Sequence, residues 1–409
     1  MTAYRKVQTE CVVRVIPLWH LNRQQEAICH FLRKEAGRCW TDMVKFHEAC
    51  REEKWLTSVD LGKIFKNSYR LYSQTIQALA QKLEANLETA RKLMLSNPRI
   101  RFPYQPKQFQ TVVWKSVSIR VRGSMIQLSN GKKQQPLKLP LPEAYLKANI
   151  RRAELTWHRN HYELCLTIDT GRPISTYPTE GLMAGVDLGE VNTAAVVTEN
   201  GDAVVISGRY MRSINRLHSK RLSAYHYHLS RCLEGSRAQA RSYYSNVRTL
   251  EKRRFQLQDI LHKASRQLVL FCLEHNVKKI VIGDVRHIQI NLEWGHVANQ
   301  RIAQWPHGRF VDYVTYKLQR YGITVEQVPE FFSSRTCSQC GYQRKSAPQR
   351  RLFHCPACGA YIHRDANGAA NICARGMGIP YGAIHVRSIK YLRPIVRSSA
   401  FETSHGCLG

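Results

Sequence analysis

The sequence contains no uninterrupted run of about 18 apolar residues, the length that a membrane-spanning helix requires. Its first residues, Met-Thr-Ala-Tyr-Arg-Lys, include no apolar core of a secretory signal, and no lipid-anchor motif is present. A basic protein can also lie on anionic lipid, but here the positive charge is spread over the whole chain. We therefore expect a cytoplasmic protein without a membrane partner.

Acidic residues are scarce. The 409 residues include 30 Asp and Glu against 62 Lys and Arg, which gives a formal net charge of +32. Solubility does not require so large an excess, so the charge predicts a polyanionic partner, above all nucleic acid. A chain of this length can form more than one hydrophobic core, and we expect two or three domains.

Disulfides are not expected, although there are 13 cysteines. Nine are scattered singly, and an odd total without an export signal indicates a reducing compartment. The other four form two C-x-x-C pairs, Cys337 with Cys340 and Cys355 with Cys358, separated by fourteen residues. Two such pairs supply four thiolates to one tetrahedral Zn²⁺ and leave no open coordination position, which predicts a structural zinc. A redox pair or chance spacing is the alternative.

The N-terminal half shows two kinds of apolar pattern. Residues 4–18 predict a short basic strand, and helical spacing then predicts helices over 22–46 and 72–94. From 111 to 170 the pattern alternates, which favours short strands joined by turns and a small β-barrel. We expect the strand at 4–18 to complete this barrel, so that the helices form an insertion between its strands.

From residue 183 onward, strands and helices alternate. The predicted elements are three short strands (184–188, 194–198 and 203–207), a long helical tract (about 212–276), a buried strand (279–283), a helix (about 299–321) and a strand (323–328). Three meandering strands, a crossover helix and further parallel strands predict an α/β fold with a ribonuclease H-like sheet. The tail beyond Gly376 has no clear pattern and is expected to be flexible.

Two aspartates stand where such a sheet can bind metal. Asp187 ends the first strand, and Asp365 begins a helix over 366–375. A carboxylate at a strand end is costly to bury unless a cation or another partner compensates its charge. Taken singly, Asp187 can be a turn residue and Asp365 a helix N-cap. Together with the zinc ribbon they indicate a metal-dependent nuclease.

A third acid is needed, because two-metal hydrolysis requires at least three carboxylates around cations about 3.5–4 Å apart. The expected position, at the end of the strand 279–283, is occupied by Gly283, which has no ligand atom. Asp284 follows, but the two-residue period of a strand directs it to the opposite face. Glu330 ends the neighbouring strand and has a longer side chain. We therefore favour Glu330, with Asp284 as the alternative.

A basic tract over 209–254 contains few acidic residues, and tyrosines are interleaved with its cations. A solvated helix face is the simpler interpretation, but such one-sided charge repels itself without a polyanion. We predict contact with nucleic-acid phosphates and some base stacking. The predicted contact residues are Arg209, Arg212, Arg216, Lys220, Arg221, Arg237, Arg241, Arg248, Lys252, Arg253 and Arg254.

Four segments follow one another in a distinctive order: Gly-Val-Asp-Leu-Gly (185–189), Thr-Cys-Ser-Gln-Cys-Gly (336–341), Cys-Pro-Ala-Cys-Gly (355–359) and Arg-Asp-Ala-Asn-Gly-Ala-Ala-Asn-Ile (364–372). This order resembles the TnpB family of transposon-encoded RNA-guided nucleases, relatives of the type V CRISPR effectors. The resemblance covers about 180–376 and continues more weakly upstream. The implied domains are a wedge-like β-barrel (1–18 and 99–180), an inserted helical recognition lobe (19–98), a RuvC-like nuclease domain (181–336 and 359–378), a zinc ribbon (337–358) and the flexible tail (379–409).

The resemblance also implies roles. Asp187 matches the first RuvC acid and Asp365 the third, whereas Gly283 stands where many relatives have Glu. Some members look rearranged, with this acid displaced to just before the triplet that precedes the first zinc pair, and Glu330 fits that pattern. His363 replaces another common acid of the motif, one that is not expected to bind metal.

The implied protein binds a guide RNA and double-stranded target DNA, which it cleaves with two Mg²⁺ ions held by Asp187, Glu330 and Asp365; a monomer is favoured. Two alternatives remain. The missing acid at position 283 recommends a nuclease-inactive, RNA-guided DNA-binding repressor. The other is a transposase that performs strand transfer itself, as other ribonuclease H-like proteins do.

Overall fold

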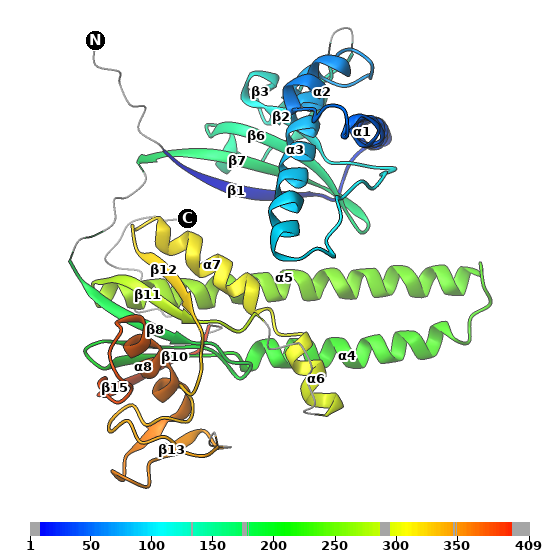
Figure 1. The fold of residues 1–409 in the computed structure, drawn as a ribbon. Coiled ribbons are helices and arrows are strands. Elements are labelled where there is room, and N and C mark those ends of the chain that lie inside the picture. The colour runs from blue at the N-terminus through cyan, green and yellow to red at the C-terminus, as the bar shows by residue number, and fades with distance from the viewer. Residues whose placement is uncertain are drawn as a thin grey trace, which may run out of the picture. The chain divides into compact units, whose positions relative to one another are not determined.

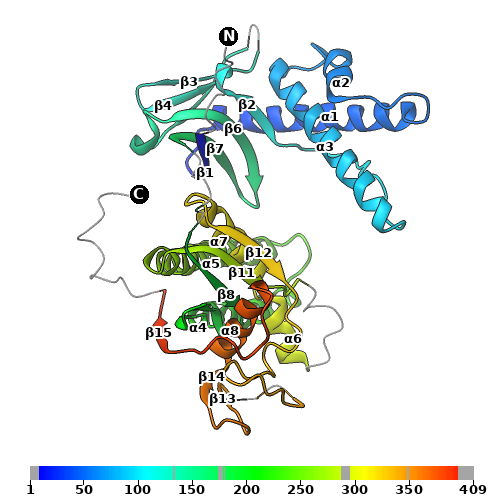
Figure 2. The ribbon, with the colours of Figure 1, turned by 60° about the vertical axis from the view of Figure 1, so that its left-hand side comes forward.

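The computed structural model describes residues 9–131, 134–173, 178, 180–286, 295–346, 348 and 350–394. The chain divides into two units, Met1–Pro173 and Ile174–Gly409, and its fold is of the mixed α/β class (Figures 1 and 2). Within the described ranges, none of the helices has both the length and the apolarity needed to cross a membrane.

The first unit combines helices with two antiparallel sheets, of strand orders β1-β7-β6-β2 and β3-β4-β5. The strands are β1 (Thr9–Leu18), β2 (Val112–Lys115), β3 (Ile119–Arg122), β4 (Met125–Leu128), β5 (Leu137–Pro140), β6 (Asn149–His158) and β7 (His161–Pro173). The helices are α1 (Arg23–Cys50), α2 (Ser58–Ile64) and α3 (Ser73–Ser96). Because β1 and β2 belong to one sheet, the three helices are inserted between two strands of that sheet.

Helix α1 begins at a capping box. The side chain of Asn22 accepts a hydrogen bond from the N–H of Gln25 (2.8 Å), and the side chain of Gln25 accepts one from the N–H of Asn22 (3.0 Å). The helix buries Trp40, and the same hydrophobic core continues through Leu83 of α3 to Leu164 of β7. Helices and sheets of this unit therefore fold around one core.

The second unit is built on a six-stranded sheet of order β12-β11-β8-β9-β10-β15 (Figure 2). Strands β8, β9 and β10 form an antiparallel meander, whereas β11, β12 and β15 add in parallel pairs. The strands are β8 (Leu182–Asp187), β9 (Asn192–Thr198), β10 (Asp202–Ser207), β11 (Val277–Gly283), β12 (Thr324–Val328) and β15 (Ser388–Leu392). A separate two-stranded ribbon consists of β13 (Leu352–His354) and β14 (Tyr361–His363).

The helices of the second unit cover both faces of the sheet. They are α4 (Arg209–Leu229), α5 (Arg237–Glu274), α6 (His296–Ala303), α7 (His307–Gln319) and α8 (Arg364–Gly376). Because side chains alternate along a strand, Ala194 and Val196 of β9 join the core formed with α5 and α7, while Ala195 and Val197 join the core formed with α8. Helix α8 approaches β8 so closely that a Cβ on Gly185 would lie 2.2 Å from the backbone oxygen of Ala369.

Three details of this unit differ from the sequence-based expectations. The tract 212–276 is two helices, α4 and α5, because Gly235 takes a left-handed φ of 73° and Ser236 caps α5 through the N–H of Gln239. The helix expected over 299–321 is divided at Pro306 into α6 and α7, since proline cannot continue a helical ladder.

The third difference concerns the C-terminal tail, which was expected to be flexible over 379–409. Residues 388–392 form β15 instead, and this strand pairs in parallel with β10 at the edge of the sheet. Without β15, the backbone N–H and C=O groups at the outer edge of β10 would have no strand to pair with. Pairing with β15 satisfies these groups and explains why residues 388–392 are ordered. Residues 395–409 lie outside the described part of the chain.

Candidate nuclease and metal sites

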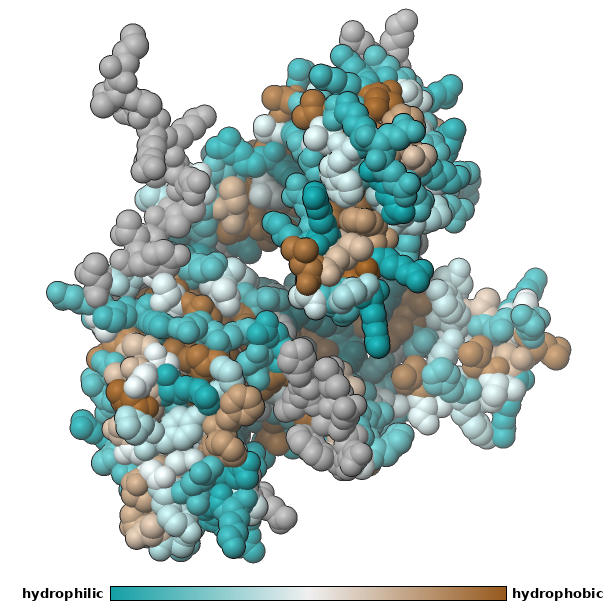
Figure 3. Space-filling view, viewed as in Figure 1, coloured by the Kyte–Doolittle hydropathy of each residue, from teal (hydrophilic) through white to brown (hydrophobic). Residues whose placement is uncertain are grey.

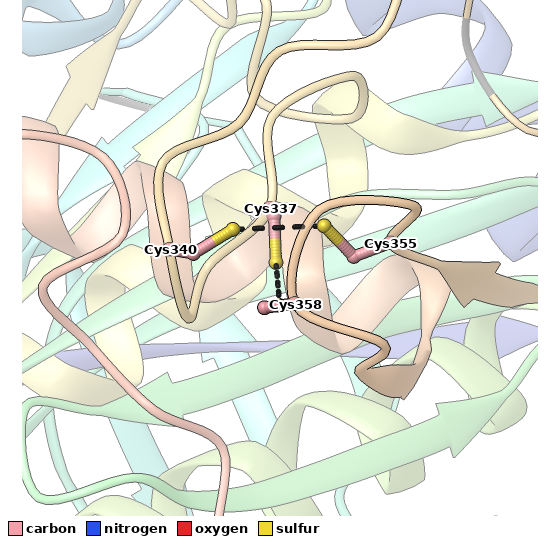
Figure 4. Close-up of side chains that lie close together, drawn as sticks. All are labelled: Cys337, Cys340, Cys355 and Cys358. Atoms are coloured by element: carbon pink, nitrogen blue, oxygen red, sulfur yellow. Dashed lines mark hydrogen bonds between the residues drawn. The ribbon is translucent and has the colours of Figure 1, made fainter.

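The four paired cysteines lie together (Figure 4), one pair before β13 and the other in the turn between β13 and β14; residues 336–363 are here termed the cysteine ribbon. Their sulfur atoms all lie within 4.8 Å of one another, with 3.8 Å between Sγ of Cys337 and Cys358 and 3.6 Å between Sγ of Cys340 and Cys355. A tetrahedral zinc with Zn–S bonds of about 2.3 Å requires S–S edges of about 3.8 Å. The arrangement therefore fits a single tetrahedral metal ion with four thiolate ligands.

Turns after each cysteine pair make this geometry possible. Gly341 and Gly359 both have left-handed φ values, 74° and 70°, and the N–H of each donates to the carbonyl oxygen of the first cysteine of its pair. Cys337 and Cys355 are buried, whereas Cys340 and Cys358 are exposed. The ribbon thus presents one side of the thiolate cluster to solvent and packs the other against Phe353.

A second cluster consists of the three acids Asp187, Glu330 and Asp365. Asp187 is the last residue of β8, Asp365 lies in the first turn of α8, and Glu330 follows β12 by two residues. Burial, followed by the charges of Glu330 and Asp365, raises the pKa of Asp187 well above its usual value. The structure therefore brings together three carboxylates that are far apart in the sequence.

The position of Glu330 follows from the parallel pairing of β11 and β12. Gly283 pairs with Val328 at the end of β12, and Glu330 follows this pair by two residues. A Cβ built on Gly283 would lie 1.9 Å from Oε1 of Glu330 and 2.6 Å from its Cδ. The carboxylate of Glu330 therefore occupies the space that a side chain at position 283 would fill.

Asp284, the alternative third acid, is held differently. Its carboxylate accepts hydrogen bonds from Nε and Nη2 of Arg286, at 3.0 and 2.6 Å. Its backbone N–H continues the pairing with β12 by donating to the carbonyl oxygen of Val328. Burial and, second, the charge of Asp284 raise the pKa of Glu330 to about 7. Asp284 thus acts on Glu330 through its charge, while its own carboxylate is engaged by an arginine.

The acids are arranged more loosely than the cysteines. Among the described residues, only the four cysteines form a group whose ligand atoms all lie within 4.8 Å of one another. A wider spacing of carboxylates suits two ions about 3.5–4 Å apart rather than one compact site. Oε1 of Glu330 is buried and has no hydrogen-bond partner, which is an unfavourable state for a carboxylate oxygen unless a cation binds it.

Three buried asparagines, to which the sequence alone assigned no role, bind either Asp365 or the segment that follows Glu330. Asn192 Nδ2 donates to Oδ2 of Asp365 at 2.8 Å. The fully buried Asn367 binds the start of the cysteine ribbon, because its Oδ1 accepts from the N–H of Ser338 and its Nδ2 donates to the carbonyl oxygen of Thr336, both at 2.8 Å.

Asn371 lies one helical turn further along α8 and is also fully buried. Its Nδ2 donates to the carbonyl oxygens of Ser333 and Thr336, at 2.8 and 2.7 Å. The two asparagines therefore join α8, the loop after Glu330 and the cysteine ribbon into one assembly. Their spacing of four residues on a helix was the available signal, since such residues share a face.

The predicted nucleic-acid contact residues fall into two groups. Arg212, Arg253 and Arg254 are engaged within the protein, by Glu190 (2.8 Å), Asn215 (2.9 Å) and Glu251 (3.1 Å) respectively. The others are exposed on α4 and α5, namely Arg209, Arg216, Lys220, Arg221, Arg237, Arg241, Arg248 and Lys252.

Part of this surface is concave. A cavity of about 680 Å³ is lined by cations from α4 (Arg209, Arg212, Arg216 and Lys220), from α6 (Arg301) and from the cysteine ribbon (Arg351). Glu190 is the one acidic residue among its lining residues. Beyond this cavity α4 and α5 extend as a hairpin, whose far end carries apolar patches in Figure 3 and includes Leu233, which is 82% exposed.

Comparisons with known proteins agree with this description. Residues 165–289 match a family model described as "Probable transposase", and residues 307–372 match one described as "Cas12f1-like, TNB domain". A TnpB-like protein of Acanthamoeba polyphaga mimivirus is 30% identical over 125 residues, which are 30% of this chain and 23% of the relative. The chain thus spans about a quarter of the length of that relative.

Two further comparisons cover more of the chain. A TnpB-like protein of Methanocaldococcus jannaschii is 23% identical over 197 residues, 47% of this chain and 69% of the relative. A cryo-EM structure of a Cas12f1-sgRNA-target DNA complex is similar with a TM-score of 0.58 and 15% identity, over 86% of this chain and 83% of that chain. At this identity the structural likeness shows the fold.

Fold and site together define a transposase-related protein of the mixed α/β class, in which a four-cysteine ribbon adjoins an acidic cluster. The sequence relatives indicate which transposase-related proteins the chain resembles. The chain is similar to the TnpB family, which is related to the type V CRISPR effectors.

Proposed function

We propose that the protein is the RNA-guided DNA endonuclease of a transposable element. It binds a guide RNA and a double-stranded DNA target, and it cuts the DNA at a ribonuclease H-like, RuvC-type site. The observation that carries this proposal is the carboxylate of Glu330, which fills the space beside Gly283 and faces the cluster of Asp187 and Asp365. The cluster therefore has three acids although the expected position has none.

The acids fit a pair of divalent cations. Glu330 Oε1 is buried without a hydrogen-bond partner, and mutual repulsion contributes to the raised pKa of Asp187. Cations would relieve both costs, and an all-oxygen ligand set suits Mg²⁺. When bound, two Mg²⁺ ions would activate a water molecule and stabilise the leaving oxygen of the phosphodiester.

The protein's own residues hold the cluster ready. Asp187 has both other acids as charged neighbours, and it would hold the cations together with them. Asn192 and Arg364 orient Asp365 by donating to its two carboxylate oxygens, at 2.8 and 3.3 Å. Glu330 stands at the start of a loop pinned by Asn371. These contacts fix the carboxylates before substrate binds, which lowers the cost of assembling the site.

Nucleic acid binding is proposed for the basic surface of α4, α5 and α6. Guide pairing would supply sequence specificity, while cations hold phosphates without reading bases. In this proposal the first unit comprises the wedge and recognition domains, and Zn²⁺ in the cysteine ribbon is structural, since four thiolates leave no open position. The complex is proposed to contain one copy of the chain.

The test is cleavage of a plasmid by the full chain purified together with its bound RNA. Sequencing that RNA identifies the guide and hence the target. We expect Asp187→Ala to abolish cutting while guide and target binding persist. The matched control is Asp259→Ala, because Asp259 is an exposed acid of α5 that pairs with Lys263 at 2.7 Å. Normal cutting by Asp187→Ala would overturn the assignment. Target binding without any cutting by the wild type would favour the nuclease-inactive repressor.

A further inference from the structure

Two adjacent phenylalanines project into solvent immediately after Glu330. The exposed fraction is 66% for Phe331 and 50% for Phe332. Leaving two large apolar side chains in water forgoes hydrophobic stabilisation. Phe332 also has a left-handed φ of 63°, which is unusual for a bulky residue and is a form of backbone strain that gathers at functional sites.

The loop that carries these rings is held in place. The carbonyl oxygen of Phe332 accepts from the N–H groups of Arg335 (3.0 Å) and Thr336 (3.1 Å). Asn371, fully buried on α8, binds the carbonyl oxygens of Ser333 and Thr336. The exposure of the two rings is therefore part of the folded structure.

The rings border a cavity of about 480 Å³, here termed the aromatic pocket, lined by Phe331, Phe332, Arg375, Gly378, Ile379 and Tyr381. Its volume lies within the range of small-molecule sites, about 300–1,000 Å³. Nη1 of Arg375 donates to the hydroxyl of Tyr381 (3.0 Å), and this hydroxyl donates to the carbonyl oxygen of Phe331 (2.9 Å). The pocket is thus shaped by a polar network as well as by aromatic faces.

The charged side chains beside the two rings are both cations. The guanidinium of Arg375 lies 5.6 Å from the ring centre of Phe331, and that of Arg335 lies 4.8 Å from the ring centre of Phe332. No carboxylate is among the lining residues of the pocket. Aromatic faces next to cations match a ligand that has flat rings and negative charge, and a single-stranded nucleic acid has both.

We propose that the aromatic pocket stacks an unpaired base of the DNA strand that is to be cut, and so directs that strand toward the acidic cluster. Paired bases within a duplex hide their faces, so the pocket selects a separated strand. Phe331 follows Glu330 directly, whereas Arg375 of the pocket lies in the last turn of α8 and Asp365 in the first, roughly 15 Å apart along the helix axis. The stacked base would therefore belong to the strand that is cut but not to the nucleotide at the acids. This inference rests on the proposed nuclease function, but the stacking itself needs no cleavage.

The test measures binding of a labelled oligothymidylate to the full chain by fluorescence anisotropy in EDTA, where cutting cannot occur. A second probe of equal length carries abasic sites. For Phe331→Ala/Phe332→Ala we expect affinity for the intact oligonucleotide to fall about 5- to 150-fold, as loss of one stacked base predicts. The abasic probe should bind wild type and variant equally. Tyr321→Ala is the matched control, because Tyr321 is 42% exposed and precedes β12, at the opposite end of that strand from Glu330.

A second variant, Phe331→Trp/Phe332→Trp, keeps aromatic faces and should bind the oligothymidylate as well as the wild type does. The proposal is overturned if the alanine variant, with unchanged thermal unfolding, binds the intact DNA normally. It is also overturned if only binding of an RNA oligonucleotide is weakened, since the pocket would then hold the guide. If the alanine variant loses base-dependent binding and the wild type never cuts DNA, the pocket would be supported and the nuclease function refuted.

Discussion

Replacing Glu330 by Gln should make the metal-free protein more stable and the enzyme inactive. The carboxylate lies in a half-buried cluster of acids, and its pKa is raised from 4.5 to about 7, by burial first and then by the charge of Asp284. One pKa unit corresponds to about 1.4 kcal/mol, so ionising this group in the folded state costs up to about 3 kcal/mol. Gln has nearly the same shape and no charge.

The pH dependence follows from the sign of this shift. Between pH 4.5 and about 7 the folded state binds more protons at Glu330 than the unfolded chain does, so the stability of the metal-free wild type falls as the pH rises. The advantage of Glu330→Gln should therefore be complete above pH 7 and vanish below pH 4.5. A gain of about 3 kcal/mol corresponds to at most roughly 6–12 °C in Tm for a unit of this size.

The assay is thermal unfolding of the full chain in EDTA at pH 8 and pH 5, repeated with Mg²⁺ at pH 8. Mg²⁺ should raise the Tm of the wild type and leave that of Glu330→Gln nearly unchanged, because ligands stabilise only the state that binds them. The cleavage rate should fall at least about 100-fold. Removing a residue that only supports a metal ligand costs up to about 100-fold, and removing a ligand itself should cost at least as much.

The control for this experiment is Glu326→Gln. Glu326 lies on the same strand, is half-exposed and pairs with Lys279 at 2.7 Å. Its replacement should change neither the Mg²⁺ effect nor the cleavage rate. A Glu330→Gln protein that is less stable than the wild type at pH 8 in EDTA, or that still cuts DNA at the wild-type rate, would refute the role assigned to Glu330.

Further predictions concern the surroundings of the site. Gly283→Ala should change the Tm by no more than about 1 °C, because its new Cβ meets only the flexible end of Glu330. Plasmid cleavage should nevertheless be lost, because the Cβ displaces the carboxylate of Glu330. Full cleavage would contradict the placement of Glu330 beside Gly283. Cys358→Ser should remove most bound Zn²⁺ in metal analysis and lower the Tm, since the thiolate cluster closes the ribbon; a retained stoichiometric zinc would show that other ligands hold it. Asn371→Ala leaves the buried carbonyl oxygen of Ser333 without its donor, at about 1–3 kcal/mol, whereas that of Thr336 keeps Asn367. Denaturant unfolding should therefore shift to lower concentration and cleavage should weaken, whereas an unchanged midpoint would refute the pinning of the loop.

Local sequence patterns were sufficient to predict several parts of the structure. The spacing of the four cysteines predicted that their thiolates would meet, because each C-x-x-C turn is a short-range structure, and the sulfur atoms do lie within 4.8 Å of one another. The helices α1 and α3 follow from apolar periodicity and, for α1, from the cap at Asn22. Local pattern failed where a short break decides the path of the chain, as at Gly235 and Pro306.

The sequence by itself determined the charge of the protein, the cysteine ribbon, the alternation of strands and helices between residues 183 and 328, and a short set of candidate acids. Only the tertiary structure decided which acid lies beside Gly283, because the choice depends on the register between β11 and β12. It also decided that Asn192 holds Asp365, across 173 residues of chain, and that residues 388–392 close one edge of the sheet. These features depend on contacts between distant segments, and no local pattern of residues encodes such contacts.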